Sequence, residues 1–153
     1  MKRLPASRIV IDANVIVKLF VPEPDSALVD ELLSPAFIAM ESGPASLALF
    51  APDAISYEVL GILVKYVRRG EVDRADARQH VADFHALALT KVMTGPLLTA
   101  AYDLAMRFFI TPYDGCYVAL AEYYRFPLLT ADDRQYHALA DTAYEPLLLT
   151  HFR

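Results

Sequence analysis

Residues 8 to 11 read RIVI, and Asp12 follows them directly. A short run of β-branched residues that stops at a polar residue predicts a strand buried inside a parallel sheet. Similar apolar runs predict strands at 47–51, 127–130 and 146–150, and the segments between them repeat apolar residues with helical spacing. Strands that alternate with helices predict an α/β fold with a mainly parallel sheet, and such folds bind ligands beyond the carboxyl ends of the strands.

Helices are expected where apolar spacing, capping residues and prolines agree. Their expected spans are 14–20, 25–33, 55–67, 73–87, 97–108, 111–124 and 133–140. Asp25 is expected to cap the second of these helices, and Gly70 to end the third. Pro35, Gly43 and Pro44 predict an irregular stretch from 34 to 44. Each of the first three predicted strands is therefore followed by a helix.

Length and composition bound the class of protein. The chain has 153 residues, of which 56% are hydrophobic, and this predicts one domain, residues 1–153, with a sizeable core. No apolar run reaches the roughly 18 uncharged residues of a membrane-spanning helix, so no membrane segment is expected. Asp12 and Asn14 interrupt the first apolar stretch and argue against a secretory signal. The single cysteine, Cys116, fits a reducing, cytoplasmic setting.

The 14 basic and 19 acidic residues give a net charge of −5. Proteins that coat nucleic acid without sequence preference are usually basic, so that class of protein is disfavoured. An enzyme that acts on nucleic acid stays open, because an active site can gather the acidic residues while basic residues cluster elsewhere. The distribution of charge therefore matters more than its total.

Four acidic residues stand where a parallel sheet brings side chains together, at strand ends or in the helices that follow. They are Asp12, Glu58, Asp114 and Asp132. Carboxylate oxygens suit Mg²⁺ or Mn²⁺, which keep several waters and bind substrate phosphate. Such an ion activates water and holds the oxygens of an in-line displacement at phosphorus. The set therefore predicts metal-dependent hydrolysis of phosphodiester bonds.

Helix capping is the alternative explanation for the three aspartates. Asp114 is the third helical residue after Thr111, as in a capping box, and Asp12 and Asp132 each precede a predicted helix. Capping does not explain Glu58, which interrupts an apolar helix face. Carboxylates gathered in one site repel one another, so in a common site at least one pKa is expected to rise.

The sequence resembles the PIN domain family, and within it the VapC-type toxins of bacterial and archaeal toxin–antitoxin pairs. The segments that carry the resemblance are IVIDANV at 9–15, PDAISYEV at 52–59, TPYDGCYVALAE at 111–122 and LLTAD at 128–132. They follow in the family's order over nearly the whole chain, and the YDGCYVALAE segment followed by TAD is the most specific part. The resemblance implies a three-layer α/β/α fold with a central, mainly parallel sheet and a Mg²⁺- or Mn²⁺-dependent ribonuclease.

The resemblance also implies roles for single residues. Asp12, Glu58, Asp114 and Asp132 would form the acidic quartet that carries the catalysis and holds the metal. Asn14 stands where family members often have a supporting Thr, Ser or Asn, and Thr130 is a second supporting candidate.

Two features depart from the family pattern. The interval between Asp12 and Glu58 is longer than is typical, and the extra residues are expected within 34–44. Asp133 directly follows Asp132, so either can be the fourth ligand. Asp132 is favoured because it lies nearer the end of the predicted strand.

A basic cluster lies on the same predicted helix as Glu58. It consists of Lys65, Arg68 and Arg69, and Lys65 and Arg69 lie seven and eleven residues beyond Glu58, on roughly its face. One hypothesis is that the cluster attracts RNA phosphates. The other is that it is a solvated patch that complements the helix dipole. Both stay open at this stage.

Partners are also expected. The resemblance implies a small antitoxin that covers the acidic crevice, and the apolar composition together with the family favours a homodimer through the helices. The alternatives are an RNA-processing PIN nuclease without an antitoxin and a non-catalytic PIN-like binding module, and the intact quartet argues against the latter. Tyrosines of the 111–124 helix either stack on bases or, more commonly for such a helix, belong to the core or an interface. They are Tyr113, Tyr117, Tyr123 and Tyr124.

Overall fold

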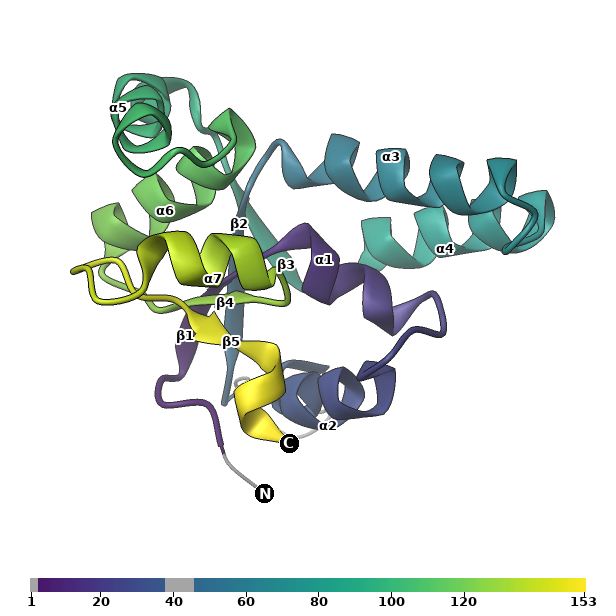
Figure 1. Cartoon of the computed structure of the whole chain (residues 1–153). Coiled ribbons are helices and arrows are strands. Elements are labelled where there is room, and N and C mark those ends of the chain that lie inside the picture. The colour runs from purple at the N-terminus through teal and green to yellow at the C-terminus, as the bar shows by residue number, and fades with distance from the viewer. Residues whose placement is uncertain (1–2, 38–45) are drawn as a thin grey trace.

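The computed structural model describes residues 3–37 and 46–153 (Figure 1). Its strands are β1 (Arg8–Ile11), β2 (Ala48–Pro52), β3 (Leu89–Val92), β4 (Leu128–Thr130) and β5 (Leu147–Leu148). Its α-helices are α1 (Ala13–Ile16), α2 (Ser26–Phe37), α3 (Ile55–Arg68), α4 (Arg74–Ala86), α5 (Leu98–Phe108), α6 (Pro112–Tyr124) and α7 (Asp133–Leu139). Short 3₁₀ turns are η1 (Val17–Leu19), η3 (Gly95–Leu97) and η4 (Leu149–Phe152). None of the described helices is long and apolar enough to cross a membrane.

The described strands form one parallel sheet in the order β3-β2-β1-β4-β5. Ile9 of β1 pairs with Leu49 of β2, and Val10 of β1 pairs with Leu128 of β4. From the central β1 the chain builds the sheet first through β2 and β3 and then, on the other side, through β4 and β5. The direction of winding therefore reverses between β1 and β4, and the carboxyl ends of these two strands flank the crevice where such sheets bind ligands.

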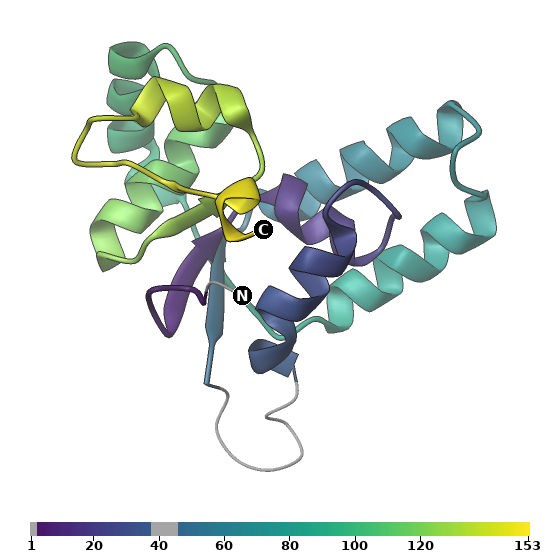
Figure 2. The same cartoon turned by 60° about the horizontal axis from the view of Figure 1, so that its bottom comes forward.

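Helices cover both faces of the sheet, so the three-layer α/β/α architecture is confirmed (Figure 2). On one face α6 packs against β1, β2 and β4, and α5 packs on the outer side of α6. The helices α1 and α2 lie on the opposite face of the sheet. The helices α3 and α4 form a hairpin that extends away from the sheet (Figure 1). Because both faces are covered, Ile9, Val10 and Ile11 are all fully buried, which explains the unbroken apolar run of β1.

The helix α2 is longer than predicted. Residues 34–37 are helical rather than irregular, and Pro35 lies inside the helix. The proline leaves the carbonyl of Glu31 without its usual amide partner, and the hydroxyl of Ser34 donates a hydrogen bond to that carbonyl at 3.0 Å. The remaining predicted irregular residues, 38–44, lie outside the described residues.

Other local predictions were wrong for identifiable reasons. The edge strand β3 was not predicted because its sequence, LTKV, exposes Thr90 and Lys91. The last strand is limited to Leu147–Leu148, because the chain turns into η4 at Leu149. The carboxylate of Asp25 does not cap α2 but accepts two hydrogen bonds from the guanidinium of Arg153, at 2.7 and 2.8 Å. Gly70 does follow the end of α3, in a left-handed conformation with φ of 71°.

The helices α5 and α6 approach each other very closely at Gly115. A Cβ atom at this position would lie 2.4 Å from the carbonyl oxygen of Ala101. Only glycine fits this contact without movement of one helix, so Gly115 fixes where the first turn of α6 lies. That turn carries Asp114.

Candidate active site

Asp12 directly follows β1 and lies buried at the crevice between β1 and β4, with 4% of the residue exposed. The Oγ1 atom of Thr130, at the end of β4, donates a hydrogen bond to Asp12 Oδ2 at 2.8 Å. The same Thr130 oxygen accepts a hydrogen bond from the backbone amide of Asp132 at 3.0 Å. One buried threonine thus links the carboxylate after β1 to the backbone after β4.

Asn14 joins the same two strand ends through a second contact. Its Oδ1 atom accepts a hydrogen bond from the backbone amide of Ala131 at 3.1 Å. Asn14 and Thr130, the two candidate supporting residues, therefore both hold the chain after β1 against the chain after β4.

The pKa of Asp12 rises to about 7, chiefly because burial disfavours the charged form. The hydrogen bond from Thr130 opposes this rise, and the negative charges of Asp114 and Glu58 add to it. Burial is the largest cause of the rise, and repulsion from the other two carboxylates is a smaller one. Asp12 stands at the N-cap of α1 and makes no capping hydrogen bond of normal geometry, although the backbone amide of Asn14 lowers its pKa.

Glu58 lies in the first turn of α3 and is held from α6. The hydroxyl of Tyr117 donates a hydrogen bond to Glu58 Oε1 at 2.9 Å. Tyr117 is fully buried, and its hydroxyl also interacts with the backbone amide of Ala13, the residue after Asp12. Burial raises the pKa of Glu58, the hydrogen bond from Tyr117 lowers it, and the charge of Asp114 raises it.

Asp114 both caps its helix and acts on the other two carboxylates. Its backbone amide donates to Thr111 Oγ1 at 3.1 Å, and its Oδ2 accepts from the Thr111 amide at 3.2 Å, which forms the predicted capping box. Its charge nevertheless raises the pKa of both Asp12 and Glu58. Capping and membership of the acidic group are therefore compatible.

Asp132 caps α7, as the alternative explanation predicts. Its Oδ1 atom accepts hydrogen bonds from the backbone amides of Arg134 and Gln135 at 2.8 and 3.3 Å. Asp132 is also linked to Asp12 through Thr130, whereas Asp133 is the first residue of α7. The structure therefore groups three carboxylates by charge, whereas Asp132 is linked to Asp12 only through its backbone amide and its carboxylate caps α7.

The donor chemistry of these carboxylates fits a divalent cation. Asp12, Glu58 and Asp114 supply oxygen atoms only, and burial and mutual repulsion disfavour the ionised forms of the first two. A positive charge nearby favours those ionised forms. Across residues 3–37 and 46–153, no group of three His, Cys, Asp or Glu side chains lies close enough together to hold a metal ion.

Comparison with known proteins identifies the family. The family model of the PIN domain matches residues 9–140. The chain belongs to the PIN domain family. Ribonuclease VapC3 of Pyrobaculum aerophilum is 32% identical to this PIN domain over 127 residues, which cover 82% of this chain and 89% of that protein.

Solved structures agree with the PIN fold. The crystal structure of PAE2754 from Pyrobaculum aerophilum matches with a TM-score of 0.65 and 23% identity over 95% of each chain. A toxin–antitoxin complex from Klebsiella pneumoniae matches with a TM-score of 0.51 and 14% identity, over 89% of this chain and 93% of that chain. At these identities the two structures support the fold alone.

Two residues of this PIN domain were not predicted as candidates for the site region: Tyr117, which contacts Glu58, and Asp53, which follows β2. Tyr117 was considered only for base stacking or the core, although it lies one helical turn after Asp114. Asp53 directly follows β2, and its Oδ1 atom accepts hydrogen bonds from the hydroxyl and the amide of Thr94 at 2.8 and 3.2 Å. The strand-end rule that selected Asp12 would also have selected Asp53.

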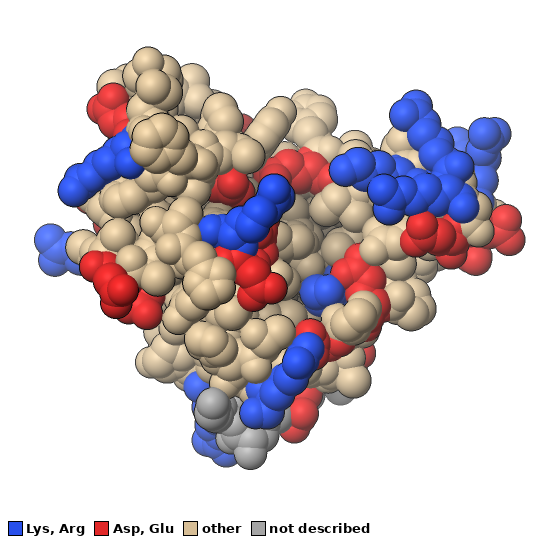
Figure 3. All heavy atoms as spheres, in the orientation of Figure 1, with Lys and Arg blue, Asp and Glu red and all other residues tan. Residues whose placement is uncertain are grey.

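The structure divides the predicted basic cluster of the PIN domain. Lys65 and Arg69 line a cavity with Asn14 and Ala131, beside the acidic crevice. Arg68 lines a separate groove between α3 and α4. In Figure 3, acidic side chains lie around the hollow at the centre of this face, and basic side chains gather over the α3–α4 hairpin.

The four tyrosines of α6 also differ in position. Tyr117 is buried, whereas Tyr113 and Tyr123 are 56% and 69% exposed and Tyr124 is 37% exposed. Base stacking is therefore a prediction for the three exposed rings alone.

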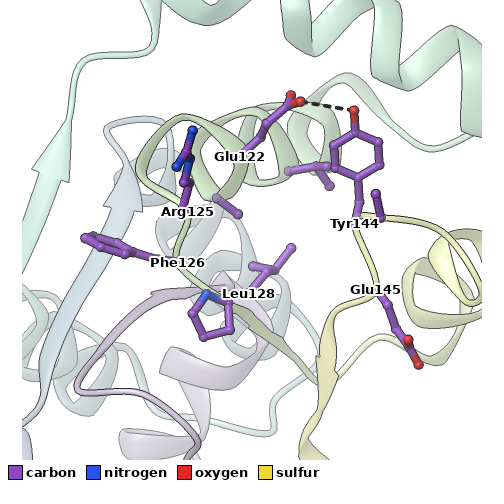
Figure 4. Close-up of a pocket in the computed structure, with 10 residues that line it drawn as sticks. Glu122, Arg125, Phe126, Leu128, Tyr144 and Glu145 are labelled. Carbon is purple, nitrogen blue, oxygen red and sulfur yellow. Dashed lines mark hydrogen bonds between the residues drawn. The ribbon is translucent and has the colours of Figure 1, made fainter.

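A further cavity of the PIN domain, of about 440 Å³, lies at the amino ends of β4 and β5 (Figure 4). Glu122, Arg125 and Glu145 line it, and Tyr144 donates a hydrogen bond to Glu122 at 3.1 Å. The acidic crevice lies at the carboxyl ends of the strands, so this cavity is not part of the candidate active site.

Proposed function

We propose that this PIN domain is a metal-dependent endoribonuclease, the toxin of a type II toxin–antitoxin pair. The observation that carries the proposal is the buried carboxylate of Asp12 at the β1–β4 crevice, within reach of the charges of Asp114 and Glu58. The relative named ribonuclease VapC3 supports RNA as the substrate.

Asp12, Glu58, Asp114 and Asp132 would hold Mg²⁺ or Mn²⁺. Bound there, the ion would activate water and stabilise the charge that develops on the phosphate oxygens. The chain itself orients the donors: Thr130 holds Asp12, Tyr117 holds Glu58, and the capping box holds Asp114. These contacts hold the three carboxylates around the crevice, and a bound ion would draw them closer together, because no three converge among the described residues.

An antitoxin partner is proposed because the relative at 32% identity is named ribonuclease VapC3 and the sequence resembles VapC-type toxins; a toxin–antitoxin complex shares the fold. The test is expression of the protein in a bacterial host, alone and together with the small protein encoded beside its gene. Growth arrest that the second protein relieves supports the toxin role. Cleavage of RNA without arrest or relief supports an RNA-processing nuclease.

The single, buried Cys116 supports a reducing, cytoplasmic setting.

A homodimer is proposed through an exposed apolar stripe on α5. Leu98, Tyr102 and Met106 are spaced by four residues and are 58%, 63% and 61% exposed, and Phe109 at the end of the helix is 96% exposed. Apolar side chains at this spacing lie on one face of a helix. A second copy would remove this face from water.

The enzymatic function is tested by incubating the purified protein with single-stranded RNA. Cleavage in Mg²⁺ or Mn²⁺ that EDTA abolishes, and that Asp12→Asn reduces at least a hundredfold, supports the proposal. Asp30→Asn removes an exposed carboxylate of α2 and is the matched control. Full cleavage in EDTA or by Asp12→Asn would refute the metal mechanism. RNA binding without cleavage would support the non-catalytic binding module.

A further inference from the structure

A small cavity on the active-site side of α3 has the properties of a phosphate subsite. It measures about 280 Å³ and is lined by Lys65 and Arg69 of α3 and by Asn14 and Ala131. Asn14 lies two residues after Asp12, and Ala131 lies between Thr130 and Asp132. One wall of the cavity is therefore the rim of the acidic crevice.

The cavity carries a net positive charge. Its one carboxylate, Glu23, is engaged by Lys18 at 2.6 Å and by the hydroxyl of Tyr66. Lys65 makes no ion pair or side-chain hydrogen bond within the described part of the chain. Arg69 has only an exposed contact of 3.9 Å with Glu71, too long for a strong ion pair. Two cations are thus available to an anion.

The amide of Asn14 adds a neutral donor to this cavity. Its Oδ1 atom is taken by the Ala131 amide, and its Nδ2 group makes no hydrogen bond to the residues that the structure describes. A guanidinium binds two oxygens of a phosphate as a fork, and an ammonium acts as a point charge. The lining therefore combines the donors that phosphate-binding sites use.

Helical geometry separates this cavity from the other basic side chains of the hairpin. Arg68, Arg74 and Arg78 line the groove on the other side, whose floor is apolar and includes Leu63 and Val67. Residues four apart on a helix share a face, whereas adjacent residues do not. Lys65 and Arg69 both line this cavity, whereas Arg68, adjacent to Arg69 in sequence, lines the other groove.

We propose that Lys65 and Arg69 bind an RNA phosphate that neighbours the one cleaved at the acidic crevice. The inference rests on the proposed nuclease function, and it narrows the predicted basic cluster to two residues. Near the carboxylates a strand of RNA is repelled, and two cations at the rim offset that repulsion where the strand leaves the crevice. By binding the neighbouring phosphate, the subsite would place the phosphate to be cleaved at the acidic group.

The first test compares two double variants that remove equal charge. Lys65→Ala/Arg69→Ala removes the proposed subsite, and Arg74→Ala/Arg78→Ala removes two exposed arginines of the opposite groove. Fluorescence anisotropy with single-stranded RNA in EDTA reports binding without cleavage. We expect the first variant to bind about tenfold more weakly, with a salt slope smaller by roughly 0.7 for each lost phosphate contact. The control should bind within about twofold of the parent protein.

The second test locates the phosphate. RNA oligonucleotides with a single cleavage site carry one neutral methylphosphonate linkage, moved along the strand from one substrate to the next. At one position near the cleavage site, we expect the neutral linkage to slow RNA cleavage by the parent protein. At that position it should not slow cleavage by Lys65→Ala/Arg69→Ala any further. Such non-additivity shows that the removed phosphate and the removed side chains interact directly.

The outcomes separate this inference from the proposed function. A parent protein that binds RNA but does not cleave it contradicts the nuclease proposal, and the binding comparison still decides the subsite. The subsite is overturned if both double variants weaken RNA binding equally, or if neither of them weakens it. If cleavage occurs and every methylphosphonate effect is additive with the Lys65/Arg69 change, the subsite is also overturned.

Discussion

The hydroxyl of Tyr117 lies 2.9 Å from Glu58 Oε1 and joins α6 to the first turn of α3. The Tyr117 hydroxyl also interacts with the backbone amide of Ala13, next to Asp12. One buried side chain therefore contacts both elements that carry the two carboxylates of raised pKa. This arrangement makes Tyr117 a positioning residue of the candidate site.

Tyr117→Phe is expected to weaken Mg²⁺ binding by about tenfold, because partners that orient a metal ligand contribute 10- to 100-fold to affinity. The pKa of Glu58 should rise further, since the lost hydrogen bond lowers it. Calorimetric titration with Mg²⁺ and the rate of RNA cleavage measure the effect. Tyr144→Phe is the matched control, because it removes a hydrogen bond to Glu122 at 3.1 Å outside the crevice. Indistinguishable Mg²⁺ affinities in the two variants would contradict the positioning role.

The metal-free protein should lose stability as the pH rises. The pKa of Asp12 is about 7 in the folded state against an ordinary value of 3.8. Between these pH values the unfolded state has released the proton that the folded state still holds, so the free energy of unfolding falls with rising pH. A difference of about three pKa units corresponds to roughly 4 kcal/mol, fully expressed above the folded pKa.

Asp12→Asn should remove that loss, because asparagine is neutral at every pH. In EDTA the variant should be more stable than the parent protein at pH 8, and this difference in stability should shrink towards pH 4. Thermal melts across this pH range measure the difference. Asp30→Asn is the control, and its difference in stability from the parent should not change with pH. A gap between parent and Asp12→Asn that does not change with pH would show that Asp12 ionises normally.

Gly115→Ala should destabilise the protein by about 1–3 kcal/mol, because the added Cβ overlaps the carbonyl of Ala101 and overpacks the α5–α6 contact. Activity should fall as well, since the first turn of α6 carries Asp114. Gly61→Ala is the matched control, because nothing lies within 4 Å of its Cβ position in α3. Alanine at this helical position should raise the free energy of unfolding by at most about 1 kcal/mol. Equal melting temperatures for both variants would contradict the close α5–α6 approach.

Tyr102→Glu should dissociate the proposed homodimer, because it places a charge in the centre of the apolar stripe of α5. Light scattering coupled to size-exclusion chromatography measures the mass. Tyr123→Glu, at a tyrosine of α6 that is 69% exposed, is the control and should leave the mass unchanged. A parent protein that is monomeric at all concentrations would refute the dimer.

The sequence by itself determined the order of elements and the position of the crevice. The unbroken run of β1 requires a strand covered on both faces, and the alternation with helices requires a parallel sheet. These two constraints placed Asp12 at the carboxyl end of a central strand. They did not reveal β3, because an edge strand with Thr90 and Lys91 exposed has no apolar pattern.

Tertiary structure decided which side chains meet. The hydrogen bond between Thr130 and Asp12 joins residues 118 positions apart, and that between Tyr117 and Glu58 joins residues 59 apart. Local spacing carries no information about such pairs, because they form only when the sheet order and the α6–α3 packing bring them together. The raised pKa of Asp12 likewise depends on burial by the whole fold. Even the basic cluster, whose members lie within five residues of one another, is divided between two sides of α3, since the adjacent Arg68 and Arg69 point to different faces.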